Sequence, residues 1–215
     1  VEKAYTGKFE TEDLTPTVPV GDFGVLELFR GPTSAFKDVA LSMLPQLLTA
    51  AIKSEGMEKE ILILTATSGD TGKAALCGFQ DVEGTEICVF YPHGGVSQVQ
   101  RAQMITQEGN NVSVCAVEGN FDDAQTGVKN IFAACQGKDL PFRLSSANSI
   151  NIGRLAPQIM YYFRSYRDLL DRGVISLGDK VHFSVPTGNF GDILAEFLAK
   201  LLGLPVGKLI CASNA

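Results

Sequence analysis

The feature that most constrains the fold is a regular alternation of short apolar runs and amphipathic stretches between residues 58 and 140. Each apolar run has the length of a strand, and after a loop a stretch of helical length follows it. The alternation predicts strands at 61–64, 86–91 and 111–117, and helices at 72–79, 97–107 and 122–135. Strands that alternate with helices form parallel sheets covered by helices. We therefore predict an α/β fold with three layers, in which helices cover both faces of a parallel sheet.

A second, less regular alternation occupies residues 142–212. It predicts strands at 142–144, 181–185 and 209–212, and helices at 152–170 and 192–202. The aromatic residues of the first of these helices (Tyr161, Tyr162, Phe163 and Tyr166) have helical spacing, which favours a place in the core over a cofactor site.

The N-terminal part shows a different pattern. Residues 1–23 contain Pro16, Pro19 and turn residues, which favour an extended lead-in. A strand at 25–29 and a helix at 39–51 are expected next, and Pro45 should dent that helix or shift its start.

Composition excludes several classes of function. With 18 basic and 24 acidic residues the net charge is −6, and no basic run occurs, so nucleic acid is not an expected partner. No apolar run approaches membrane-spanning length and no signal peptide opens the chain. Five scattered cysteines indicate reduced thiols and a cytoplasmic protein, and two histidines without metal-ligand spacing predict no metal site.

Three polar loops follow predicted strands, at the positions where open α/β sheets bind ligands. The first, Thr65–Gly72, combines small hydroxyl residues and glycines before a helix, which favours an anion such as a carboxylate or a phosphate. It is not a Walker A loop, because Thr67 replaces the first glycine and Ala74 replaces the Mg²⁺-binding Ser or Thr.

The other two loops are less specific by themselves. In Pro186–Asp192, Gly188 and Gly191 would let the backbone approach a phosphate closely, and Asp192 suits an N-cap. The loop Ser145–Asn151, followed by Arg154, has more polar side chains than a turn needs, although a group of N-caps for the next helix explains them equally well.

A lysine stands where a strand turns into a helix, in Gly31-Pro-Thr-Ser-Ala-Phe-Lys-Asp38. Ser34 is expected to cap the helix and Lys37 to lie in its first turn, where the helix dipole disfavours an ammonium group. A deprotonated lysine is a nucleophile that forms Schiff bases with carbonyls, although a lone lysine is usually a solvated surface residue. Two loops that suit anions and a lysine that can form a Schiff base together predict a carbonyl cofactor that is bound to Lys37 and carries a phosphate. Pyridoxal phosphate (PLP) fits this description.

Four motifs in this order resemble threonine synthase, a family of the fold-type II PLP enzymes. They are Gly31–Asp38, Thr65–Gly72, Ser146-Ala-Asn-Ser-Ile-Asn151 and Val185-Pro-Thr-Gly-Asn-Phe-Gly-Asp192, and together they span nearly the whole chain. The resemblance implies the architecture of the tryptophan synthase β subunit. Residues 1–57 and 141–215 would form part of a large PLP domain and residues 58–140 a small mobile domain, with the active site between them.

The resemblance also implies a role for each motif. Lys37 would form the internal aldimine with PLP and later act as the mobile acid and base. Asp70 would lie beside the phenolic oxygen of the cofactor, at a position where many relatives have asparagine but threonine synthases usually have aspartate. The cofactor phosphate would be held by Gly188, Asn189, Phe190, Gly191 and Asp192. The substrate α-carboxylate would be held by Thr67, Ser68, Gly69 and Thr71, and the substrate phosphate would face Asn148, Ser149, Asn151 and Arg154.

The implied reaction is the conversion of O-phosphohomoserine and water to threonine and phosphate, a lyase-type step of threonine biosynthesis. We expect the chain to be a piece of a longer protein, since it starts at Val1 and stops after the predicted strand at 209–212. The residue facing the pyridine nitrogen would lie beyond residue 215, so this piece alone should have little activity. The sequence does not decide between a monomer and a dimer.

Three alternatives stay open. One is another fold-type II lyase, such as a serine or threonine dehydratase, against which the combination of the last two motifs argues. The second is a non-catalytic module that binds phosphate. The third is a degenerate paralogue that binds the cofactor without turnover.

Overall fold

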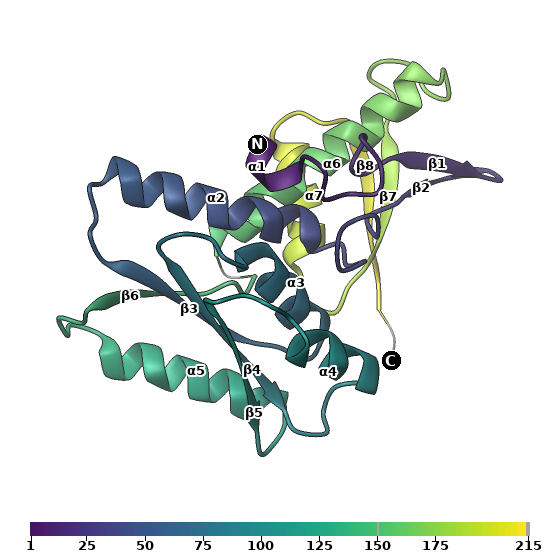
Figure 1. The fold of residues 1–215 in the computed structure, drawn as a ribbon. Coiled ribbons are helices and arrows are strands. Elements are labelled where there is room, and N and C mark those ends of the chain that lie inside the picture. Colours follow the sequence, from purple (N-terminus) through teal and green to yellow (C-terminus); the bar gives the residue numbers. More distant parts are fainter. Residues whose placement is uncertain (150, 214–215) are drawn as a thin grey trace.

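The computed structural model describes residues 1–149 and 151–213, and its largest sheet has four parallel strands in the order β5-β4-β3-β6 (Figure 1). Ile150 of the third loop and the last two residues of the chain lie outside the described residues. The strands are β3 (Glu60–Ala66), β4 (Thr85–Pro92), β5 (Val112–Val117) and β6 (Phe142–Ser145). The connecting helices are α3 (Asp70–Phe79), α4 (Gln98–Ile105) and α5 (Phe121–Cys135). The predicted β/α alternation is therefore present, with element ends within a few residues of the predicted ones.

Helices cover both faces of this sheet, which makes the predicted three layers (Figure 1). Along β3, Ile61 and Ile63 pack toward α3 and the helix α2 (Asp38–Ser54), whereas Leu64 and Ala66 pack toward α5. Successive side chains of a strand point to opposite faces, so a strand buried on both faces needs a continuous apolar run.

The second part of the molecule is built on the long helix α6 (Ile152–Asp171). Against it pack α7 (Gly191–Leu201) and the two-stranded parallel sheet of β7 (Val181–Pro186) and β8 (Val206–Ala212). The tyrosines of α6 are buried in this core, as predicted. The short helix α1 (Glu2–Tyr5) lies against α2, with the Tyr5 hydroxyl donating to the Val39 carbonyl.

The structure differs from the expectations in two places. The lead-in forms an antiparallel hairpin of β1 (Thr17–Val20) and β2 (Phe23–Leu26), so the strand expected at 25–29 starts earlier and ends earlier. The strand β6 pairs with β3, whereas the division predicted at residues 140 and 141 assigned it to the other domain. Hydrogen bonding between strands decides both, between neighbouring strands in the hairpin and between strands distant in sequence for β6 and β3, and periodicity does not report it. None of the helices in the described part of the chain is long and apolar enough to cross a membrane.

Helix α2 joins the two parts, and Pro45 leaves it unbroken. Because proline has no N–H, the carbonyl of Leu41 receives no helical hydrogen bond. Gly78 of α3 lies so close to this carbonyl that an added Cβ would be 2.1 Å from the Leu41 oxygen. The expectation that Pro45 shifts the helix start was wrong, since α2 begins at Asp38.

Substituting Gly78 should therefore separate α2 from α3. We expect Gly78→Ala to lower the free energy of unfolding by about 2 kcal/mol, because the methyl group would overpack a backbone contact. Gly127 is the matched control: it lies in α5, and an added Cβ would meet nothing within 4 Å. Gly127→Ala should raise the free energy of unfolding by about 1 kcal/mol through helix propensity alone. Urea denaturation measures both values, and an equal effect of the two substitutions would contradict the contact.

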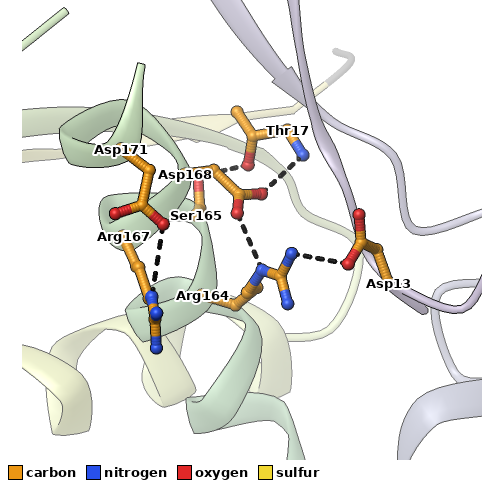
Figure 2. A network of polar contacts seen from close by, with 7 residues as sticks. All are labelled: Asp13, Thr17, Arg164, Ser165, Arg167, Asp168 and Asp171. Carbon is orange, nitrogen blue, oxygen red and sulfur yellow. Dashed lines mark hydrogen bonds and ion pairs between the residues drawn. The ribbon is translucent and has the colours of Figure 1, made fainter. Parts of the chain in front are cut away.

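The hairpin is held to α6 by a polar network around Asp168 (Figure 2). One oxygen of this carboxylate accepts from the Thr17 backbone N–H at 3.0 Å, and the other accepts from Arg164 Nε at 2.7 Å. Thr17 Oγ1 donates to Ser165 Oγ, and Arg164 also reaches Asp13 at 2.7 Å. Asp168 is largely buried, so its removal would leave the buried Thr17 N–H without a partner.

A second carboxylate on the same helix provides the comparison. Asp168→Ala should lower the free energy of unfolding by about 1–3 kcal/mol, the range for leaving a buried donor unpaired. The exposed pair of Arg167 and Asp171, at 3.3 Å, is also drawn in Figure 2, and Asp171→Ala should cost less than about 0.5 kcal/mol. Thermal or urea unfolding of both variants tests this difference, and similar losses in the two would argue against a structural role of the network.

Candidate active site

The loop before α2 fixes the position of Lys37. This loop folds over the buried carboxylate of Asp38, which accepts from the Thr33 N–H at 2.8 Å, from the Thr33 hydroxyl, and from the Ala35 N–H at 3.4 Å. Gly31 must lack a side chain, since an added Cβ would lie 2.5 Å from Asp38. Burial raises the pKa of the Asp38 carboxyl, and the hydrogen bonds from Thr33 oppose this shift.

The expected cap of α2 was wrong. Ser34 has a positive φ of 57° and makes no capping hydrogen bond to α2, and Asp38 orders the turn instead. Lys37 is itself the N-cap residue, one position before the first turn in which it was expected.

The Lys37 amine is mostly shielded from water and lies among charges from four helices. Nζ is 4.0 Å from Asp70 Oδ2 and 4.2 Å from the ring centre of Phe36. Burial lowers the pKa of Lys37, and the charge of Arg154 acts in the same direction, whereas Asp70, Asp192 and Asp38 oppose it. A lysine with a lowered pKa holds more free amine at neutral pH, which is what a nucleophile needs.

The side chain of Lys37 lines a small cleft where α3, α6, α7 and the loop before α6 meet. Most of the residues predicted for the site are brought together here, although they lie far apart in sequence. The cleft is lined by Phe36, Lys37, Thr71, Asn148, Ser149, Arg154, Gln158, Asn189, Gly191 and Asp192. A larger hollow lies at the other end of the sheet, between the end of α5 and β6, and contains none of the predicted residues.

Arg154 supplies a buried positive charge to this cleft. Its side chain is almost completely buried, and Nη1 donates to the Ala147 carbonyl at 2.6 Å. Nε has no partner among the described residues. Burial lowers the pKa of Arg154 to about 10, so the guanidinium stays charged at neutral pH. A buried cation with an unused donor fits an anionic ligand, because it would otherwise be desolvated without compensation.

The loop 187–190 leads into the N-terminus of α7 and fits a phosphate. An added Cβ at Gly188 would meet nothing within 4 Å, so the backbone is open to an approaching group. Within residues 1–149 and 151–213, no acceptor is bonded to the N–H groups of residues 188–192. Free N–H groups at a helix N-terminus form an anion site, and this one is fit for the phosphate of a cofactor bound to Lys37.

Asp192 does not cap α7, contrary to the expectation. The N-cap residue is Phe190, whose ring is exposed, and Asp192 lies inside the first turn. Its buried carboxylate accepts hydrogen bonds from the hydroxyls of Tyr161 and Tyr162, the second at 2.7 Å. Burial raises the pKa of Asp192, and the two tyrosines and Lys37 oppose this shift. Asp192 therefore anchors the start of α7 to α6 and places a negative charge near Lys37.

In the loop between β3 and α3, some of the polar groups form hydrogen bonds within the loop itself. Thr67 is buried, and its hydroxyl accepts from the N–H groups of Gly69 and Gly72, both at 2.9 Å. Thr67 therefore shapes the loop and does not line the cleft, whereas Thr71 does. Ser68 is exposed, and the N–H groups of Asp70 and Thr71 have no acceptor among the described residues.

The loop before α6 contains both a helix cap and residues that line the cleft, so each of the two interpretations of this loop applies to some of its residues. Asn151 caps α6 by accepting from the Gly153 N–H at 2.9 Å, and its amide donates to the Ser146 carbonyl, so it does not line the cleft. Asn148 donates to the Ala66 carbonyl at 3.0 Å, which ties the loop to the end of β3. Asn148 and Ser149 then line the cleft beside Arg154.

Four residues at the site were not among the predicted ones. Phe36 and Gln158 line the cleft, and the hydroxyls of Tyr161 and Tyr162 hold Asp192. The helical spacing of the two tyrosines predicted that they lie in the core, and they do. Spacing alone did not indicate that their hydroxyls also bind Asp192. In the part of the chain that the structure describes, no group of His, Cys, Asp and Glu could hold a metal ion.

Comparisons with known proteins show what this chain is similar to. No family model matches the chain. Threonine synthase of Pseudomonas aeruginosa is 45% identical over 218 residues, and human threonine synthase-like 1 is 41% identical over 230 residues. Both alignments include 100% of this chain, but only 44% and 30% of the relatives, so the chain spans less than half their length.

Solved structures give the same result. The crystal structure of PLP-bound threonine synthase from Brucella melitensis matches 99% of this chain with a TM-score of 0.84 and 41% identity. Yeast threonine synthase matches 99% of the chain with a TM-score of 0.82. These matches cover 44% and 43% of the two structures. Since close similarity in both sequence and structure extends over all of the four motifs, this chain has, along the stretch it spans, the fold of the threonine synthases that it matches.

Proposed function

We propose that this chain is the part of a threonine synthase that carries the reactive lysine and the phosphate sites. The reaction is the conversion of O-phosphohomoserine and water to threonine and phosphate in threonine biosynthesis, in the cytoplasm. The observation that carries the proposal is the cleft itself. Lys37, whose amine is shielded, the buried Arg154, which has an unused donor, and the open start of α7 line it together.

Lys37 would hold the cofactor and then move protons. Its amine would hold PLP through a Schiff base with the aldehyde, formed with loss of water, and the lowered pKa of Lys37 favours this bond. After release it is the only amine in the cleft lining, so it is the group that would carry protons between neighbouring carbons of the substrate. When bound, PLP supplies an electron sink for carbanions.

Two anchors would orient the cofactor. The N–H groups of residues 188–192 would bind its phosphate at the positive end of α7, and the contacts of Asp192 with two tyrosines keep that end in place. Asp70 would face the reacting end of the cofactor, and its distance of 4.0 Å from the Lys37 amine supports this role.

Two further groups of residues would bind the substrate. The N–H groups of Asp70 and Thr71 and the Thr71 hydroxyl would donate to the α-carboxylate at the start of α3. Arg154, Asn148 and Ser149 would donate to the phosphate that leaves in the reaction. Movement of the small sheet domain toward the larger part would exclude water during the carbanion steps, as lids do in other enzymes.

The rival functions predict different substrates and different ligands. A dehydratase would act on serine or threonine and would gain nothing from a buried arginine beside the leaving group. A module that only binds phosphate would not need Lys37. A degenerate paralogue would bind PLP and release no phosphate from O-phosphohomoserine.

The deciding experiment is to add PLP, reduce with borohydride and map the labelled peptide. The proposal expects a visible absorbance band and a reduced adduct on Lys37, followed by phosphate release from O-phosphohomoserine in an enzyme of the relatives' full length. No adduct on Lys37, in either this chain or that longer protein, would favour the phosphate-binding module. An adduct without phosphate release in the longer protein would favour the paralogue or, if serine is consumed, the dehydratase.

A further inference from the structure

The first turn of α4 contains a side chain that reaches the site from outside the cleft. Ser97 and Gln100 form a capping box: the Gln100 N–H donates to Ser97 Oγ, and the Ser97 N–H donates to Gln100 Oε1, both at 3.1 Å. A capping box uses only one atom of the glutamine head group. Here the other atom, Nε2, donates to Asp70 Oδ1 at 2.9 Å.

The carboxylate of Asp70 is thereby held from both sides. Oδ1 accepts from Gln100, and Oδ2 is 4.0 Å from Lys37 Nζ. The backbone next to Asp70 leaves space for this contact, because Gly69 has a φ of 146° and an added Cβ would lie 2.3 Å from Gln100 Nε2. A side chain at residue 69 would therefore displace the glutamine.

Asp70 depends on this contact more than the other acids near Lys37 do. Asp38 is buried under its own loop, and Asp192 is buried between two tyrosines. The side chain of Asp70 is 57% exposed, so nothing buries it in one orientation. Arg154 is the positive charge that acts on the Lys37 amine, and it is held in place by its burial and by its hydrogen bond to the Ala147 carbonyl.

We propose that Gln100 is a positioning residue for the reactive lysine: its amide keeps the Asp70 carboxylate turned toward Lys37 while it closes the first turn of α4. The electrostatic consequence concerns Lys37 in the protein alone, and the catalytic consequence rests on the proposed function. The position of α4 thereby becomes linked to the protonation of the amine, through a contact between residues 30 positions apart.

The test measures the reactivity of Lys37 without cofactor. The rate at which acetic anhydride labels Lys37, followed by peptide mass spectrometry, reports the fraction of free amine at a pH where most of the lysine is protonated. Asp70→Asn should increase this rate about fivefold, since one opposite charge at 4 Å in water is worth about 1 kcal/mol. Gln100→Met should change the rate in the same direction, because it removes the hydrogen bond and keeps the length of the side chain.

The double variant decides whether Gln100 acts through Asp70. If it does, Gln100→Met in the Asp70→Asn background should change nothing further, which is the signature of coupled residues in a double-mutant cycle. Ser97→Ala is the matched control, because it breaks the same capping box and leaves the Asp70 contact, and its labelling rate should equal that of the unmodified protein.

Three results would overturn the proposal: an unchanged rate in Gln100→Met, an additive effect in the double variant, or the same increase in Ser97→Ala. Failure of Lys37 to bind PLP would instead refute the proposed function, and it would leave these labelling rates unaffected. In an active enzyme, the further expectation is that Gln100→Met shifts the pH profile of kcat and Ser97→Ala does not.

Discussion

Lys37→Ala is expected to abolish the covalent attachment of PLP and to lower kcat by about 10³-fold or more, since one side chain supplies both the nucleophile and the proton carrier. The cleft has no substitute amine: among its lining residues Lys37 is the only lysine, and the other cation is a guanidinium. The measurement is the visible absorbance of the protein with added PLP, borohydride trapping, and phosphate release in an enzyme of the relatives' full length.

The matched control is a lysine at the other end of the same helix. Lys53 is exposed in the last turn of α2, far from the cleft lining, and Lys53→Ala should leave the absorbance band and turnover unchanged. A Lys37→Ala protein that still traps PLP on a lysine after borohydride would contradict the assignment. Retained noncovalent binding of PLP would not contradict it, because in the proposal the N-terminus of α7 would hold the phosphate independently.

Arg154→Met is expected to lower kcat/KM for O-phosphohomoserine by about 10²-fold, the effect of losing a charge-assisted hydrogen bond in a desolvated site. The covalent attachment of PLP to Lys37 should persist, because the proposed cofactor phosphate site is the start of α7 and contains no arginine. Arg154→Lys should not restore activity, since an ammonium lacks the planar set of donors that matches a phosphate. Steady-state phosphate release measures the first effect, and borohydride trapping measures the second.

Arg167 on the same helix is the control for charge and for helix stability. It is exposed and pairs with Asp171, so Arg167→Ala should leave kcat/KM within about twofold of the unmodified enzyme, as a surface pair contributes little. Two results would argue against a substrate-phosphate role of Arg154. One is a loss of PLP affinity that accounts for the whole effect, and the other is an equal loss toward a substrate without phosphate.

The local features of the site were predictable from sequence. The lysine in Gly31–Asp38 and the three polar loops could be found because each is a continuous segment at the end of an apolar run. Lys37, Asn148, Arg154 and Asn189 do line one cleft. The alternation explains only part of this: the loops after β3 and β6 meet because these strands are parallel neighbours that end at the same edge of one sheet. Lys37 and Asn189 follow strands of the two other sheets, so tertiary packing brings them to the cleft.

Roles within these segments were less predictable, since they depend on partners elsewhere in the chain. Thr67 and Asn151 have the same residue types as their cleft-lining neighbours, but their side chains close a loop and cap a helix. Asp192 had the sequence position of a cap, and two tyrosines 31 and 30 residues away bind it instead. Hydrophobic periodicity reports which face of an element is buried and does not report which polar groups meet there.

The sequence by itself predicted the α/β class, the order of the units, the resemblance to threonine synthase and a lysine at the start of a helix, because apolar periodicity and short motifs are local properties of the chain. Only the tertiary structure decided the pairing of β6 with β3, the hairpin before α2, and the contact of Gln100 with Asp70. In each case two segments form hydrogen bonds only after the chain has folded, and many partners in the sequence would have satisfied the same donors. Local patterns therefore select the elements, whereas long-range hydrogen bonding and packing decide which polar side chains are left to bind a ligand.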